Sequence, residues 1–246
     1  MVRFVPVGDR LERTPMEDVL AVLAIGGAAL FASTLAAVAG FGGAAVMLPV
    51  LVWRFGITDA VPILTIAQLM GNLSRVWFNR TELSFQVVKW FGFGAVPSAI
   101  VGGIIFATAP AAALVRVLGL FLLLMVVYRH TPWGRDTKIG LRGFLPLGLT
   151  SGAISAVVGV VGPFMAPFFL AHGLVRGAYI GTEALATVMM HVTKLTVYGG
   201  FNLMDLNIGL VGVAIGSVMF AGSYLGKQIL NRMPAARFPI VIDVVL

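Results

Sequence analysis

The chain has 246 residues, of which 59% are hydrophobic and 11% are charged, and its formal net charge at pH 7 is +7. Its mean hydropathy of +0.99 means more apolar surface than one soluble core can bury, which excludes a soluble globular fold and indicates a membrane protein. The absence of cysteine excludes disulfides, thiolate metal sites and thiol redox relays. The basic residues lie in short loops between apolar stretches, where they indicate membrane orientation or anionic lipid rather than nucleic acid.

The first half of the chain is predicted to hold five apolar helical segments after an N-terminal arm, residues 1–17. These segments lie at about 19–39, 44–55, 59–78, 88–107 and 110–128. Most are near the length of about 20 residues that crosses a bilayer, and strand-like alternation is absent, so helices are expected. The first segment is longer than the apolar part of a signal peptide and is expected to be retained. The second is too short to cross the membrane comfortably, which predicts a broken or re-entrant helix.

The second half of the chain repeats this plan. A polar loop, residues 129–142, precedes apolar segments at 144–158, 163–171, 177–198, 208–230 and 238–246. An ungapped offset of 119 residues aligns the two halves, and the matched positions include Gly40 with Gly159, Gly43 with Gly162, Asn72 with His191, and Arg75 with Lys194. Glycines and cations at matching positions inside apolar segments rarely coincide by chance. The sequence therefore predicts an all-α polytopic membrane protein built from two repeats, residues 18–128 and 143–246.

The orientation of the repeats follows from the number of segments and from the loop charges. Five segments is an odd number, so the second repeat is expected to enter the membrane from the opposite side, which makes the repeats inverted. With the N-terminus outside the cell, ten loop cations lie on the inner side and four on the outer side. This bias agrees with the excess of basic residues in inner loops. The inner set is Arg80, Lys89, Arg129, Arg135, Lys138, Arg142, Arg176, Lys227, Arg232 and Arg237.

A glycine cluster interrupts each repeat just before a short apolar segment. Such a break leaves backbone N–H groups unpaired and a positive helix end within the membrane, which suits an anionic ligand. Proline directly after the second cluster fits the first turn of a helix, where its missing N–H has no helical partner to lose. The simpler alternative is that the glycines only allow close helix packing. The candidate substrate-binding residues of the two breaks are Gly40, Gly42, Gly43, Gly159, Gly162 and Pro163.

The third segment of each repeat carries polar residues on one helical face. A spacing of three or four residues places such side chains on the same side of a helix. We expect them to take part in substrate binding, with the cation of the first repeat toward the inner mouth of a pathway and that of the second toward the outer mouth. These residues are Gln68, Asn72 and Arg75 in the first repeat, and Glu183, Thr187, His191 and Lys194 in the second.

Each of these polar residues also has a structural alternative. The two cations can extend to the lipid headgroups, and Asn72 can bond a neighbouring helix. His191 is either a packing residue or a proton carrier. Glu183 either complements a helix dipole or takes part in proton coupling.

An enzyme is not indicated by the sequence. Three scattered histidines and few acidic residues within the apolar segments leave no nucleophile and base pair and no metal-ligand spacing such as HExxH. A nucleotide phosphate-binding loop is also absent, so transport driven by ATP is not expected. We therefore expect no cofactor and no metal.

Two stretches, Gly40 to Pro49 and Gly159 to Pro167, each pair a glycine cluster with a nearby proline and precede a polar-striped helix. This pattern resembles the sulfite exporter TauE/SafE family, also called TSUP, and the resemblance covers essentially the whole chain. It implies a multi-pass carrier of the bacterial inner membrane, with a periplasmic N-terminus, that moves sulfite or organosulfonates such as sulfoacetate by alternating access.

Two alternative functions remain open. They are a carrier of another small organic anion, such as a carboxylate, and a non-transporting membrane scaffold subunit. The expected partners are a small anionic substrate and the lipid bilayer, with a homodimer left open.

Overall fold

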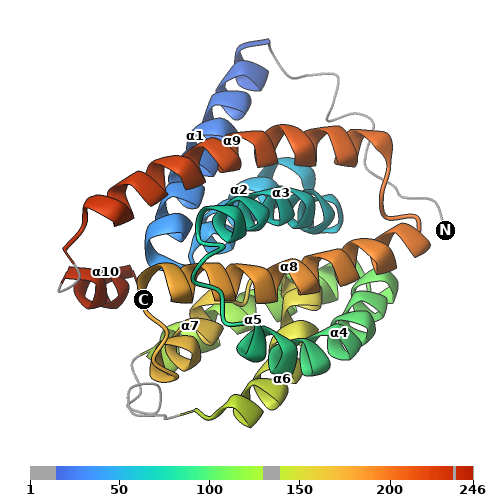
Figure 1. Ribbon diagram of the computed structural model, residues 1–246. Helices are drawn as coiled ribbons and strands as arrows, with labels where there is room; N and C mark the ends of the chain where they lie inside the picture. The colour runs from blue at the N-terminus through green and yellow to red at the C-terminus, as the bar shows by residue number, and fades with distance from the viewer. Residues whose placement is uncertain (1–14, 130–138, 235–236, 246) are drawn as a thin grey trace.

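The computed structural model describes residues 15–129, 139–234 and 237–245, and these residues are helical apart from short connections, with no strand (Figure 1). The helices are α1 (Pro15–Ala39), α2 (Gly43–Phe55), α3 (Ile57–Phe78), α4 (Phe85–Thr108), α5 (Ala111–Arg129), α6 (Phe144–Val158), α7 (Gly162–Ala171), α8 (Arg176–Gly200), α9 (Leu206–Arg232) and α10 (Phe238–Val245). A short 3-10 helix, Leu141–Gly143, precedes α6. Each predicted apolar segment corresponds to one helix, so the all-α prediction is confirmed. Residues 1–14 of the predicted arm and 130–138 of the predicted loop lie outside the described residues.

Several described helices have the length and composition of membrane spans. Four qualify, namely α1 from Asp18 onward, α4, α6 together with its 3-10 turn, and α9. The helices α2 and α7, and α5 up to Leu124, are apolar but shorter. Large apolar side chains such as Phe93, Ile104 and Leu210 are exposed on the outer faces, where lipid can cover them. The polar stripes predicted from the sequence lie on α3 and α8, which have many buried residues.

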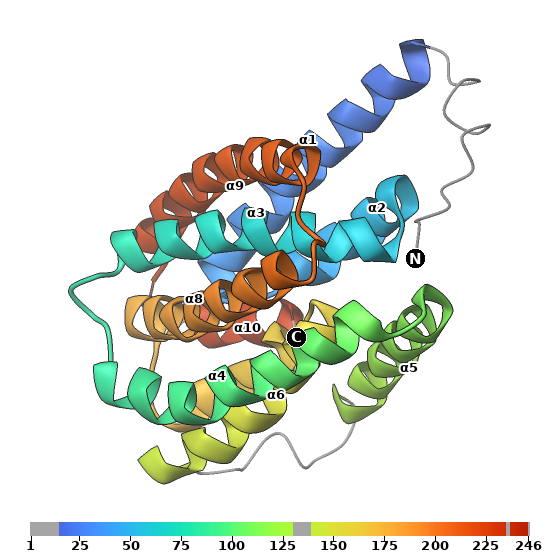
Figure 2. The same ribbon diagram turned by 90° about the vertical axis from the view of Figure 1, so that its right-hand side faces the viewer.

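The helices of the two halves pack against each other in matching pairs. Under the 119-residue offset, α6 corresponds to α1 and α9 to α4. The extensive contact between α1 and α9 therefore matches that between α6 and α4, and the contact of α3 with α9 matches that of α8 with α4. Figure 2 shows α1 and α9 on one side, α4 and α6 on the other, and α3 and α8 between them. The two polar-striped helices thus form the centre of the bundle, where they contact each other.

Glycine allows the closest of these helix contacts. A side-chain carbon added at Gly148 in α6 would overlap the backbone carbonyl of Phe91 in α4, and one added at Gly152 would overlap that of Ala95. At the matching interface, a carbon at Gly222 in α9 would lie 2.7 Å from the carbonyl oxygen of Leu30 in α1. Small residues let helix backbones approach this closely, which is the main source of packing energy between helices in lipid.

Candidate functional site

The two glycine clusters break their helices with the same backbone turn. Gly40 directly follows α1 and has φ of +87°, and Gly159 directly follows α6 and has φ of +86°. Glycine adopts this left-handed conformation without the steric cost that a side chain brings. The turns differ two residues later, because Gly42 is also left-handed at φ of +96° whereas its counterpart Val161 has φ of −147°. The sequence match at the first glycine thus corresponds to a match in backbone geometry.

The two breaks lie against each other and line one small cavity. A side-chain carbon at Gly162 would lie 2.9 Å from the Cβ of Phe41 and 3.9 Å from the backbone nitrogen of Gly42. The cavity has a volume of about 40 Å³ and is bordered by residues 40–45 and 159–163, together with Ala36 and Ser155. It is large enough for roughly three water molecules, or for one small ion.

The first turns of α2 and α7 offer backbone donors to this cavity. The first N–H groups of any helix have no partner within that helix. In α2 these include the N–H groups of Gly43, Ala44 and Ala45, and all three residues line the cavity. In α7 the corresponding donor is Gly162, because Pro163 at the next position has no N–H. Two positive helix ends therefore meet at one place.

Arg75 of α3 occupies the carbonyl end of α1. Its Nη1 donates to the carbonyl oxygens of Gly40 at 2.6 Å and Ala36 at 3.3 Å, and only 5% of the residue is exposed. Its Nη2 donates to the side-chain oxygen of Asn72, one turn back on the same helix. A cation at the C-terminal end of a helix offsets the negative charge of the free carbonyls there.

Lys194 of α8 does the same for α6. Its Nζ is 3.3 Å from the carbonyl oxygen of Ser155 and 3.1 Å from the Ser155 hydroxyl, and the residue is fully buried. Ser155 is the counterpart of Ala36 under the 119-residue offset, so the two cations bind repeat-equivalent carbonyls. Unlike Arg75, Lys194 does not line the cavity.

An ion pair joins the two halves beside the cavity. Nη1 of Arg75 in α3 lies 3.3 Å from Oε2 of Glu183 in α8, and both side chains are buried. The other carboxylate oxygen accepts a hydrogen bond of 3.1 Å from the Thr187 hydroxyl. The counterpart of Glu183 in the first half is Leu64, so this acid has no repeat equivalent. The ion pair therefore joins the two halves at one place, and the 119-residue offset gives it no second copy.

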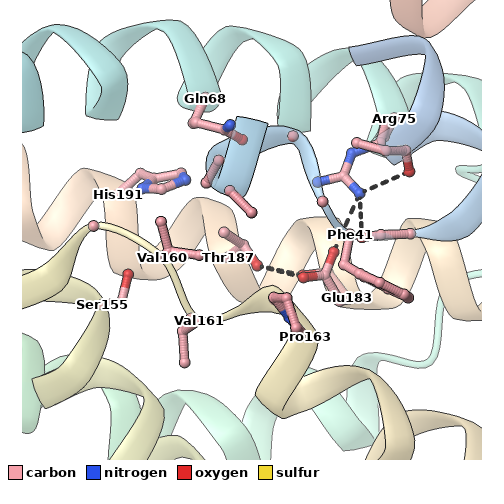
Figure 3. Close-up of a pocket in the computed structure, with 18 residues that line it drawn as sticks. Phe41, Gln68, Arg75, Ser155, Val160, Val161, Pro163, Glu183, Thr187 and His191 are labelled. Atoms are coloured by element: carbon pink, nitrogen blue, oxygen red, sulfur yellow. Dashed lines mark hydrogen bonds and ion pairs between the residues drawn. The ribbon is translucent and has the colours of Figure 1, made fainter. Parts of the chain in front are cut away.

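Several polar atoms that face the cavity have no hydrogen-bond partner among the described residues. They are Nε2 of Gln68 and both ring nitrogens of His191, in residues that are 5% and 3% exposed. A buried polar group without a partner costs about 1–3 kcal/mol, and such groups are rare in native proteins. In Figure 3, Gln68 and His191 lie at one end of the cavity and the Arg75–Glu183 pair lies at the other, with Thr187 between them. This arrangement is typical of a site that receives a polar ligand.

Comparison with protein-family models gives a match over residues 25–246 to the sulfite exporter TauE/SafE family. The chain belongs to this family. TauE/SafE proteins are transporters of the sulfite or anion exporter type, and the apolar helices agree with a multi-pass membrane protein. Neither a comparison with curated proteins nor one with solved structures gave a match.

In this TauE/SafE chain the structure brings most of the candidate site residues together at the cavity. Those that line it are Gly40, Gly42, Gly43, Gln68, Arg75, Gly159, Gly162, Pro163, Glu183, Thr187 and His191. Two candidates, Asn72 and Lys194, instead contact lining residues from behind. Phe41, Ser155 and Val160 line the cavity as well and were not among the candidates. One sequence feature could have indicated Ser155. It is a hydroxyl side chain within the apolar α6, at the position equivalent to Ala36 under the 119-residue offset.

The structure bears on two interpretations of the cations. Neither Arg75 nor Lys194 extends to the membrane surface, because both side chains bond to helix ends inside the bundle. Lys194 is fully buried in this structure, with its Nζ against Ser155, and the assignment of the two cations to opposite mouths stays a prediction. Both cations point inward because α1 and α6 end inside the protein, where the negative ends of these helices attract a positive charge.

Proposed function

We propose that this protein is a secondary transporter that carries a small sulfur-containing anion, such as sulfite or an organosulfonate, across the bacterial inner membrane. The observation that supports this most strongly is the convergence of two helix N-termini and three unpartnered side-chain nitrogens on one cavity. Oriented N–H groups at helix N-termini bind oxyanions without further charge. Family membership supports the same substrate class.

The positions of the cations support an anion rather than a cation as the substrate. The negative ends of α1 and α6 also reach the cavity, and on their own they would oppose the positive ends of α2 and α7. Arg75 and Lys194 bind the carbonyls at those negative ends. The positive ends of α2 and α7 therefore dominate the field in the cavity.

The proposed mechanism is alternating access between two inverted repeats, with the N-terminus in the periplasm. The matched helix contacts support the repeats, because every major contact between the halves has a counterpart under the 119-residue offset. The excess of basic residues in the inner loops supports the orientation. In this mechanism the halves move relative to each other around the cavity, and proton coupling through Glu183 or His191 stays a prediction.

The small volume of the cavity favours sulfite among the proposed substrates. A cavity of about 40 Å³ holds a compact ion more easily than sulfoacetate, which carries an additional carboxymethyl group. A carboxylate carrier remains a weaker candidate, because two opposed helix ends present donors from two sides and suit an anion with several oxygens around one centre. A scaffold subunit has no need of unpartnered donors at a shared cavity.

Flux measurements on purified protein test the proposal. Proteoliposomes with an imposed ion gradient and no ATP are expected to take up sulfite, and uptake of sulfonates and carboxylates is measured in parallel. The variant Gly162→Val places a side chain against Phe41 in the cavity and is expected to abolish uptake. The matched control is Gly119→Val, since a Cβ at Gly119 has no neighbour within 4 Å among the described residues. If the protein moves none of these anions under any gradient, the proposal is wrong.

A further inference from the structure

The cavity contains a carboxylate, which a site that only attracts anions does not need. Glu183 is 2% exposed and lines the cavity together with the first turns of α2 and α7. Its oxygens accept hydrogen bonds from Arg75 and Thr187. A carboxylate accepts up to about four hydrogen bonds, so lone pairs remain free. Because Leu64 stands at the equivalent position in the first half, the acid is not required by the repeat architecture.

The charges around the cavity match an anion with one negative charge. Among the lining residues, all of them within the described part of the chain, only Arg75 and Glu183 are formally charged, and they cancel. Lys194, which binds the end of α6, carries one positive charge, and the carbonyl ends of α1 and α6 together carry the equivalent of about one negative charge, so these cancel as well. The ends of α2 and α7 each carry the equivalent of about half a positive charge, so together they offer about one. A dianion would leave an excess negative charge enclosed by the protein, which is unfavourable.

Apart from His191, Thr187 and Ser155, which can each donate and accept, the hydrogen-bonding groups of the lining are of two kinds. The N–H groups of α2, α7 and Gln68 are donors that suit bare anion oxygens. The carboxylate of Glu183 is only an acceptor, so it repels a bare oxygen and attracts an acidic O–H. A ligand that satisfies both kinds has bare oxygens on one side and a hydroxyl on the other.

We propose that the cavity selects a singly charged oxyanion that still carries an acidic hydrogen, with its hydroxyl donating to Glu183 and its bare oxygens accepting from the two helix ends. This inference rests on the proposed function and narrows it. Among sulfur anions, hydrogen sulfite has these properties. The sulfite dianion has the wrong charge, methanesulfonate lacks the hydroxyl, and sulfoacetate has a second charge.

Two anions of nearly the same shape test this selection. At mildly acidic pH, methylphosphonate is a monoanion with one hydroxyl, and methanesulfonate is a monoanion with none. Binding of each to the full-length protein in lipid nanodiscs is measured by isothermal titration calorimetry. A charge-assisted hydrogen bond to Glu183 predicts that methylphosphonate binds about tenfold more tightly. Equal binding, or tighter binding of methanesulfonate, overturns the inference.

A change of pH provides the test of charge. At alkaline pH methylphosphonate becomes a dianion, and its binding is expected to fall below that of methanesulfonate. Methanesulfonate keeps its charge over this range and therefore reports any titration of the protein itself. A dianion that binds as tightly as the monoanion contradicts the inference.

Two variants test whether Glu183 is the residue that favours methylphosphonate over methanesulfonate. Glu183→Gln is expected to bring the ratio of the two affinities close to one. Gln68→Leu, which removes a donor that serves both anions, is expected to weaken both and to keep the ratio. Glu183→Gln removes the charged partner of Arg75, and the variant can fail to fold for that reason. In that case the affinities of the two anions for the unmodified protein still decide whether the cavity selects an anion with a hydroxyl.

The outcomes also separate this inference from the proposed function. If sulfite is transported and the two test anions bind equally, selection by Glu183 is wrong and the transport function stands. If neither sulfite nor any test anion binds or moves, both are wrong.

Discussion

The two glycine breaks share a backbone and differ in the contacts of their side chains. Gly40 and Gly159 make the same left-handed turn, and a cation bonds to the carbonyl of Ala36 at one break and of Ser155 at the other. At the first break, however, Arg75 also contacts Gly40 and Glu183, whereas Lys194 bonds only to Ser155. Gly40 is enclosed by Tyr179, and Gly159 has no neighbour closer than 3.6 Å to an added carbon.

The backbone turn is thus common to the two halves, whereas the side chains around it differ. A symmetric pair of breaks provides two opposed helix ends, which attract any small anion. Two side chains that line the cavity differ between the halves, because Glu183 and Gln68 have Leu64 and Thr187 at the equivalent positions. The first break is therefore expected to be more sensitive to substitution than the second, and this difference can be tested.

The largest difference is expected between the two cations. Arg75→Met leaves Glu183 buried without its counter-charge, which is expected to lower the free energy of unfolding by about 3–5 kcal/mol. Lys194→Met removes bonds to one residue and is expected to cost about 1–3 kcal/mol. Thermal unfolding of the purified variants in the same detergent compares them. Combining Arg75→Met with Glu183→Gln is expected to recover part of the loss, and equal losses for both single variants would contradict the asymmetry.

The next difference concerns the glycines at the turns. Gly40→Ala adds left-handed strain of about 1–2 kcal/mol and also places a carbon 2.6 Å from Cζ of the buried Tyr179 ring. Overpacking of this kind adds about 1–3 kcal/mol. Gly159→Ala has only the strain, because its nearest neighbour is Leu48 at 3.6 Å. We expect the first variant to unfold at a clearly lower temperature, and an equal shift would show that Tyr179 moves aside without cost.

The turns themselves could be predicted from sequence, and the contacts across the halves could not. Glycine clusters in apolar segments, matched at one offset, were sufficient to locate both breaks and the lining helices α3 and α8. The pairing of Arg75 with Glu183 was missed because the residues are 108 positions apart and the acid has no repeat counterpart. The contact of Lys194 with Ser155 was also missed, because the place of Lys194 near the end of an apolar segment does not indicate where α6 ends.

The smallest difference is expected at the residues that accept from the cations. Ser155→Ala removes the hydroxyl that Lys194 contacts and is expected to cost about 1 kcal/mol, the net value of a typical hydrogen bond. Ala36, at the equivalent position, has no hydroxyl, so the first break has no equivalent hydrogen bond to lose. Sulfite flux is measured alongside stability, and a loss of flux with Ser155→Ala beyond its loss of stability would give Ser155 a direct contact with the substrate.

The claim that a single anion is held between the two helix ends is tested most directly by locating the anion. Selenite, the selenium analogue of sulfite, can be found in crystals of the protein by its anomalous scattering. The account predicts one selenium peak in the cavity, with the selenite oxygens within hydrogen-bonding distance of the backbone N–H groups of Gly43 to Ala45 and of Nε2 of Gln68. An empty cavity, or a selenium peak elsewhere in the bundle, in protein that transports sulfite would contradict it.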